Sequence, residues 1–216
     1  MQADPSALEE LKRLGVPRVP AVAVGDRAVH GWNPAGYAEL VGIDYKPAVK
    51  LPPDVLAERL DTILAAAEAL VRVIPASRME WTPPERNRPV ADLAYHIFRL
   101  AIGFVEGVDR LKFGENVHSE TAPADLRKGD EIARYGALVR ARVSGWFDGA
   151  GGDEFTRVVD TYWGPVPAHD LLERTTWHTA QHLRQLYALA ERLRITPPTP
   201  LPVEAFDGLP LPASLW

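Results

Sequence analysis

The chain has 216 residues, of which 46% are hydrophobic and 25% are charged, values that are ordinary for a globular protein. Its net charge of -5 and the absence of a basic cluster argue against a nucleic acid as partner. The sequence contains no cysteine, which excludes disulfides, a thiolate nucleophile and sulfur ligands for a metal.

The hydrophobic runs are all far shorter than the ~20 residues that are needed to span a bilayer. The chain also does not open with a charged segment followed by an apolar one, as a signal peptide would. We therefore expect a cytoplasmic protein that has no membrane partner.

The first 45 residues predict a small α-β-β-α segment. Residues 4–14 favour a helix, because proline suits its first turn and glycine its end. Residues 19–24 and 27–29 favour two strands with a tight turn between them. Asn33 and Pro34 then provide a cap and a first residue for a helix that extends to about Val41.

Residues 46–195 begin with a proline-rich linker and continue with helical patterns. Apolar residues recur at the 3.6-residue period over 56–71, 90–111 and 132–146, and a last helix is expected from about 168 to 194. Four amphipathic helices of such length predict an antiparallel four-helix bundle, so the fold class is mainly α.

The connections between these helices are long, at residues 75–88, 113–129 and 148–167, and loops of this kind often form the wall of a site. The last part of the chain, 196–216, is rich in proline. We expect it to follow the surface in extended form.

The clearest chemical signal is the pair His178 and His182. Residues four apart lie on one face of a helix, one turn apart, so two imidazoles in this arrangement can reach one metal ion. Both histidines fall on the apolar stripe that faces the bundle interior, where a polar group is costly unless it is satisfied. A metal satisfies them, although two histidines at this spacing are also common without one.

His96 lies at the edge of the apolar face of the second bundle helix. Considered alone, it would be interpreted as a histidine that bonds a backbone carbonyl. Together with His178 and His182 it completes three imidazoles, and three protein ligands with open positions are typical of a catalytic metal site.

These three histidines, at this spacing and on these helices, resemble the DinB family of metal-binding four-helix bundles over roughly residues 50–195. The family includes bacillithiol-dependent S-transferases and mycothiol-dependent isomerases. The resemblance implies a divalent ion such as zinc, nickel or manganese on His96, His178 and His182. It also implies a low-molecular-weight thiol and a small electrophile as partners, and a possible homodimer.

Residues 16–32 resemble the second half of glutaredoxin, with the Val19-Pro20 step, the following turn and the Gly31-Trp32 step. The first half of that fold and its catalytic cysteines are missing. The resemblance thus implies half of a thioredoxin-like fold without redox activity, kept either as a docking surface or as a structural remnant.

Four residues near the metal motif are candidates for substrate binding: Tyr162, Trp163, Trp177 and Gln181. Each also has an ordinary structural interpretation as a loop aromatic or as a helix-packing residue. His118 lies in a polar stretch beside acidic residues and is expected to be solvated.

The resemblance to the DinB family therefore implies a metal-dependent thiol S-transferase that acts on small electrophiles. Two alternatives remain open. One is a metal-dependent hydrolase with a metal-activated water, for which no carboxylate adjoining the histidine motif provides an obvious general base. The other is a non-catalytic bundle that is stabilised by its metal and binds a ligand or a partner.

Overall fold

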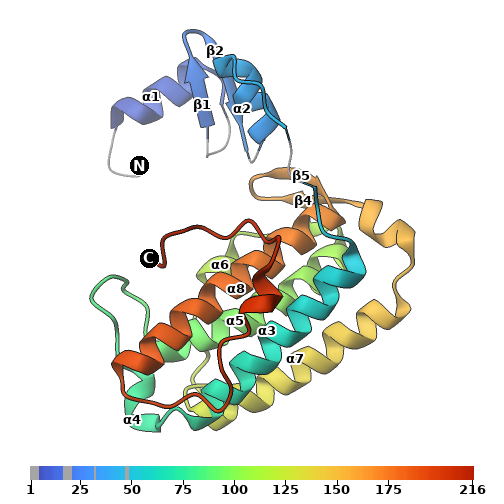
Figure 1. The fold of residues 1–216 in the computed structure, drawn as a ribbon. Coiled ribbons are helices and arrows are strands. Elements are labelled where there is room, and N and C mark those ends of the chain that lie inside the picture. The colour runs from blue at the N-terminus through green and yellow to red at the C-terminus, as the bar shows by residue number, and fades with distance from the viewer. Residues whose placement is uncertain (1–4, 17–20, 32, 47–48) are drawn as a thin grey trace. The chain divides into compact units, whose positions relative to one another are not determined.

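The computed structural model describes residues 5–16, 21–31, 33–46 and 49–216, and the chain divides into two compact units (Figure 1). One unit consists of Met1–Val49 together with Asp160–Pro165. The other consists of Lys50–Val159 and Val166–Trp216.

The smaller unit has the predicted α-β-β-α order. It contains α1 (Pro5–Arg13), β1 (Ala21–Val24), β2 (Arg27–His30) and α2 (Pro34–Val41). The strands pair antiparallel, with Ala21 opposite His30 and Val24 opposite Arg27. Residues 19 and 20, which were expected to open the first strand, lie outside the described residues, as does Trp32.

Two local features explain the path of the chain between β2 and α2. Asn33 caps α2, since its side chain accepts a hydrogen bond of 2.9 Å from the amide of Gly36. Gly31 has a φ of +78°, and a Cβ atom placed on it would lie 2.2 Å from the carbonyl oxygen of Trp163 in the same unit. Only glycine therefore fits at position 31.

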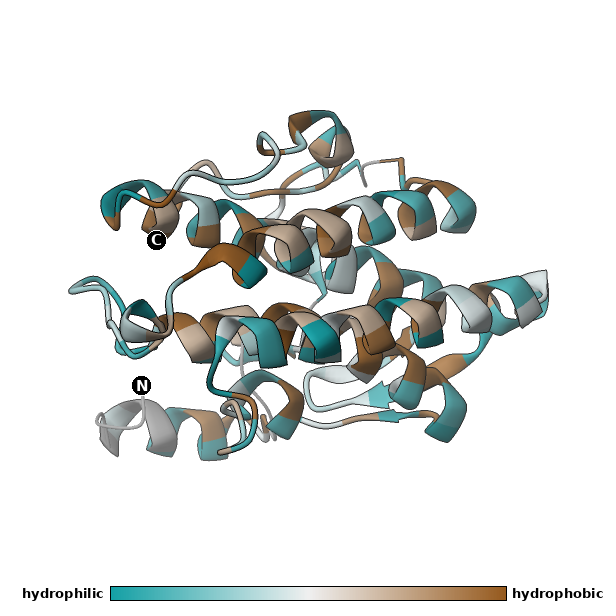
Figure 2. Ribbon diagram, turned by 90° about the horizontal axis from the view of Figure 1, so that it is seen from below, coloured by the Kyte–Doolittle hydropathy of each residue, from teal (hydrophilic) through white to brown (hydrophobic). Residues whose placement is uncertain are grey.

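The larger unit is a four-helix bundle, which confirms the predicted fold class. Its helices are α3 (Pro53–Val73), α5 (Val90–Arg110), α7 (Gly129–Gly149) and α8 (Ala168–Arg192). Hydrophobic and hydrophilic residues alternate around them (Figure 2), as amphipathic helices require. α3 and α5 each pack mainly against α7 and α8, so α3 and α5 are diagonal to one another.

The order of the helices differs from a simple up-and-down bundle. Phe98 of α5 contacts Tyr135 of α7, and further along both helices Phe104 contacts Trp146, with ring centroids 6.5 and 5.2 Å apart. The consecutive helices α5 and α7 therefore run in the same direction. The long connection at 113–129 is needed to bring the chain back along the bundle between them.

Prolines set the starts of three bundle helices. α3 begins with Pro53 after Pro52, α5 follows Pro89, and α8 follows Pro167. Proline lacks the backbone N–H that a first turn leaves unpaired, so it favours a helix start at these positions. The interior of the bundle is filled by large side chains that are almost fully buried. Among them are Phe98, Phe104, Leu56, Leu60, Ile63, Leu64, Leu70, Ile97, Leu100 and Ile132.

The connections carry short elements that were not predicted. They are α4 (Ala76–Met79), β3 (Lys112–Phe113), α6 (Asn116–Ser119), the 3₁₀ helix η1 (Gly152–Thr156), β4 (Val158–Thr161) and β5 (Gly164–Pro167). β3, β4 and β5 form a sheet in that order. The stretch 148–167, expected as an irregular loop, is thus largely ordered. The expected extended tail contains a 3₁₀ turn, η2 (Val203–Phe206).

Within the described ranges, none of the helices combines the length and the hydrophobicity that a membrane crossing demands.

Candidate metal centre

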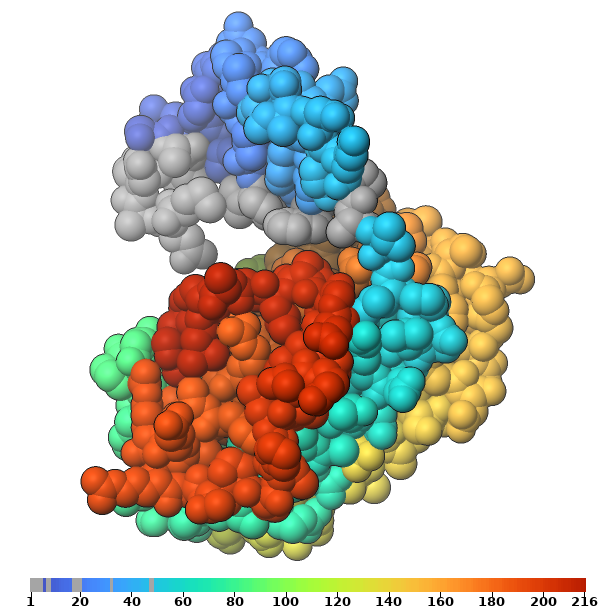
Figure 3. Space-filling view, in the orientation of Figure 1, coloured from blue at the N-terminus to red at the C-terminus, as the bar shows by residue number. Residues whose placement is uncertain are grey.

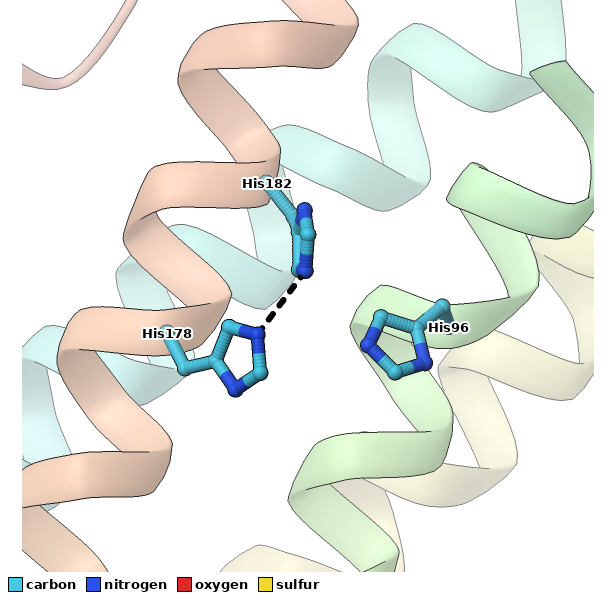
Figure 4. A group of neighbouring side chains, drawn as sticks. All are labelled: His96, His178 and His182. Carbon is cyan, nitrogen blue, oxygen red and sulfur yellow. Dashed lines mark hydrogen bonds between the residues drawn. The ribbon is translucent and has the colours of Figure 1, made fainter. Parts of the chain in front are cut away.

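The structure brings His96, His178 and His182 together in the bundle interior. His96 comes from α5 and the other two from α8, and the three rings face one another (Figure 4). The ring centroid of His96 lies 5.7 Å from that of His178 and 4.8 Å from that of His182. One potential ligand atom from each residue lies within 4.8 Å of the other two.

The antiparallel packing of α5 and α8 explains this meeting. A Cβ atom placed on Gly107, near the end of α5, would lie 3.5 Å from Leu171, near the start of α8. His96, in the first half of α5, therefore meets the middle of α8. His178 and His182 point to the same side there because they are one helical turn apart.

Burial keeps the three imidazoles neutral. It lowers the pKa of His96 to about 2, an effect to which the neighbouring His182 and Arg88 contribute. Burial likewise lowers the pKa of His182 to about 4, against a smaller opposing effect of its hydrogen bond with Gln185. The pKa of His178 is also well below its ordinary value, because of burial and then of His182. Neutral imidazole is the form that binds a metal.

Hydrogen bonds orient two of the rings. The Nδ1 atom of His182 lies 2.7 Å from the side-chain oxygen of Gln185, and its Nε2 atom lies 3.0 Å from Nε2 of His178. The amide oxygen can only accept, so His182 carries its proton on Nδ1. Its Nε2 atom therefore presents a lone pair toward the other two histidines.

The donor set fits a divalent metal ion. The ring nitrogens that face one another are the Nε2 atoms of His178 and His182, 3.0 Å apart, and one nitrogen of His96 is turned toward them (Figure 4). Imidazole nitrogens bind zinc at about 2.0–2.1 Å, so two on one ion lie at most ~4.2 Å apart. The three ligand atoms lie within 4.8 Å of one another, slightly wider than this limit.

A fourth histidine, His118, lies beside the three, which corrects the expectation that it is solvated. Its ring stacks on His178 with centroids 5.1 Å apart and an interplanar angle of 26°, and it lies 6.2 Å from the ring of His96. Burial lowers the pKa of His118 to about 4, with further contributions from Arg174 and Arg88. Its neighbours Glu115 and Glu120 suggested a solvated loop, but the loop folds onto the bundle.

Three contacts hold this loop in place. Glu120 accepts hydrogen bonds from Tyr95 at 3.0 Å and from Arg99 at 2.6 Å, both on α5. Arg88 donates to the backbone carbonyl of His118 at 3.0 Å. α6 can approach α5 because residue 103 is a glycine, where an added Cβ would lie 2.7 Å from Val117.

The charges around the centre are positive. Arg86, Arg88 and Arg174 each act to lower the pKa of at least one of the clustered histidines. Among the described residues, the candidate ligand group is made of imidazoles alone and contains no carboxylate. A divalent ion would keep its full charge here, so the centre favours an anionic further ligand.

The four candidate substrate-binding residues belong to two different compact units. Trp177 lies beside His178, with ring centroids 5.5 Å apart, and Arg174 lies 5.5 Å above the Trp177 ring. Gln181 donates to the backbone carbonyls of residues 214 and 215 and not to a histidine. Tyr162 and Trp163 belong to the smaller compact unit.

Sequence reasoning missed His118, Gln185 and Arg88. Gln185 could have been predicted, because it follows His182 by three residues on the same helix face. His118 and Arg88 lie in connections without periodicity, so no sequence signal placed them near the three histidines.

Comparison with known proteins agrees with this picture. The sequence profile of the DinB superfamily matches residues 59–186, more than half of the chain. The chain belongs to the DinB superfamily. No curated protein matches it.

Two solved structures from Bacillus subtilis have the same fold. The DinB-like protein YjoA aligns with a TM-score of 0.53 at 13% identity, over 65% of this chain and 92% of its own. YfiT, described as a probable metal-dependent hydrolase with an unusual four-helix bundle topology, aligns with a TM-score of 0.54 at 14% identity. That alignment covers 71% of this chain and 96% of YfiT. At these identities the likeness concerns the fold.

Proposed function

We propose that this chain is a metal-dependent enzyme that transfers a low-molecular-weight thiol to a small electrophile. The observation that carries the proposal is the cluster of His96, His178 and His182, neutral and facing one another inside a DinB-family bundle. Zinc, nickel and manganese all accept imidazole ligands, so the donor set is compatible with each.

A divalent ion held by His96, His178 and His182 would supply a positive charge that favours the deprotonated form of a thiol or a water. The chain supplies the rest of the environment. Gln185 fixes the orientation of His182. Arg86 and Arg88 line a small pocket beside His182 and attract an anionic nucleophile. A thiolate is such an anionic nucleophile, and its attack on the electrophile needs no general base from the protein.

A second candidate function is hydrolysis, and one observation favours it. His118 stacks against His178 and is a neutral imidazole that could accept a proton from an attacking water. The sequence had offered no general base for this reaction. The description of YfiT as a probable metal-dependent hydrolase points in the same direction.

Thiol dependence separates the two functions. Protein purified without a nickel column is supplied with zinc, nickel or manganese and incubated with 1-chloro-2,4-dinitrobenzene, with and without bacillithiol, mycothiol, glutathione or cysteine. Thioether formation is followed by absorbance. In parallel, p-nitrophenyl acetate without thiol reports hydrolysis. His178→Ala provides the control, since it removes one ligand.

Thioether formation that requires the wild-type protein and is lost in His178→Ala would support thiol transfer. Ester hydrolysis that needs no thiol, is lost in His178→Ala and is weakened in His118→Ala would support the hydrolase instead. The absence of both activities with every metal would contradict the proposal.

A further inference from the structure

The last residues of the sequence are bound to the helix that carries two of the histidines. Three side chains of α8 donate hydrogen bonds to backbone carbonyls of this segment, which we call the 212–216 segment. Gln181 donates to Leu215 at 2.8 Å, Arg184 to Pro212 at 2.9 Å, and Gln185 to Leu215 at 2.7 Å. Figure 3 shows the dark red atoms of this part of the chain lying against the orange atoms of α8.

One of these bonds continues to the metal centre. Gln185 donates from its amide nitrogen to the carbonyl of Leu215, and its amide oxygen accepts from Nδ1 of His182 at 2.7 Å. The two bonds require opposite ends of the amide. The carbonyl of Leu215 therefore fixes which end of Gln185 faces His182.

The orientation of the Gln185 amide determines which nitrogen of His182 carries the proton, and so which one is free to bind a metal. If the amide of Gln185 turned over, its NH₂ group would face Nδ1 of His182, and the proton of that ring would move to Nε2. The lone pair that faces His178 would then be lost. Gln185 is only 3% exposed, so solvent offers no alternative partner that would hold the amide in its present orientation.

The 212–216 segment also forms one wall of a small pocket beside the centre. Trp216 lines this cavity of about 30 Å³ together with Pro83, Arg86, Arg88, Leu93, His182 and Gln185. Arg192 lies 5.4 Å over the ring of Trp216 and forms an ion pair of 2.8 Å with Glu85. Gln185 thus bonds to Leu215 of the segment and shares this pocket with Trp216.

We propose that the 212–216 segment is a working part of the metal centre, and that it positions His182 for metal binding through Gln185. This inference rests on the proposed function, since it needs the three histidines to bind a metal. Gln185 is a positioning residue, because it acts on His182 and does not itself contact the ion. Gln181 helps indirectly by holding the segment in place.

Zinc affinity of the full-length chain tests the proposal, measured by competition with a chromophoric chelator. Gln185→Leu is expected to weaken binding 10- to 100-fold, about the usual cost of removing an orienting partner from a metal ligand. Gln181→Leu loosens the segment and leaves Gln185 intact. It is expected to weaken binding about threefold or more, because the apparent affinity falls with the fraction of molecules that hold Gln185 correctly.

The double variant decides the route. If the segment acts through Gln185, then Gln181→Leu has no further effect once Gln185→Leu is present. Gln185→Glu offers only acceptor oxygens to His182, so it should retain zinc affinity and make that affinity insensitive to Gln181→Leu. The visible absorption of the cobalt-loaded protein should change in Gln185→Leu and be restored in Gln185→Glu, which a purely structural role of Gln185 would not produce.

Tyr187→Phe is the matched control. It removes a hydrogen bond of 3.0 Å from α8 to the carbonyl of Thr199, outside the 212–216 segment, and should leave zinc affinity unchanged. Equal zinc affinity of wild type and Gln181→Leu would overturn the proposal, as would an undiminished effect of Gln181→Leu in the Gln185→Leu background. A wild-type protein that binds no metal would refute the proposed function itself.

Discussion

Acidification of the metal-free protein should destabilise it, because the buried histidines are neutral in the folded state. The pKa of His182 gives the size of the expected loss in the free energy of unfolding. Its pKa is lowered from an ordinary value of 6.5 to about 4 by burial. Below pH 6.5 His182 becomes protonated in the unfolded chain. In the folded chain it stays neutral until the pH approaches 4. Stability from this group is therefore complete above pH 6.5 and is lost as the pH falls toward 4.

The magnitude follows from the two pKa values. At pH 5.5 the unfolded state binds ~0.9 proton at this site and the folded state almost none. The free energy of unfolding should therefore fall by about 1 kcal/mol per pH unit from His182 alone. Between pH 7.5 and pH 5 the loss amounts to ~2 kcal/mol. His96 and His118, whose pKa values are also lowered by burial, add to the loss in the same direction.

Urea unfolding followed by circular dichroism, with a metal chelator present, gives the free energy of unfolding at each pH. His182→Leu removes the titrating group, so between pH 6 and 5 its free energy of unfolding should fall less steeply than that of wild type, by a difference of about 1 kcal/mol per pH unit. Parallel pH profiles for wild type and His182→Leu would refute the reasoning, because His182 would then titrate alike in the folded and unfolded states.

Three further predictions concern packing, a buried carboxylate and the metal. Gly136→Ala should destabilise the bundle by about 1–3 kcal/mol, since its Cβ would lie 2.5 Å from the buried Phe98. On the same helix, Gly145→Ala meets nothing within 4 Å and should stabilise by ~0.5–1 kcal/mol, both measured by urea unfolding. Asp92→Ala should cost about 1–3 kcal/mol in the same assay, because the amide of Ala122 loses its acceptor at 3.0 Å. Zinc at 100 times its dissociation constant should stabilise the protein by ~2.7 kcal/mol, seen as a higher melting temperature.

Periodic signals explain what the sequence could predict of the fold. The bundle helices have apolar stripes and proline starts, and both are local properties that can be read without knowing the neighbours. The directions in which the helices run could not be predicted in this way. That α5 and α7 run parallel depends on the path of the 113–129 connection, which no local pattern specifies.

The candidate site likewise has residues that the sequence could predict and one that it could not. His178 and His182 share a helix face, so their spacing alone indicated that they act together, and His96 joined them through its place on a second amphipathic helix. His118 could not be predicted, because its position depends on Glu120 reaching Tyr95 and Arg99 across the bundle surface. Such long-range contacts have no signature in the sequence of the loop itself.

The half-thioredoxin resemblance of residues 16–32 stays a prediction. The described part of the segment has the expected strand, turn and strand, but a hairpin followed by a helix occurs in many folds.

The most direct test of the account is the metal content of wild type and of His178→Ala, both purified without a nickel column and measured by elemental mass spectrometry. Three neutral imidazoles around one point predict about one equivalent of a divalent metal in the wild type, lost in the variant. A folded wild-type protein that carries no metal and takes up no zinc, nickel or manganese when these are added would contradict the account.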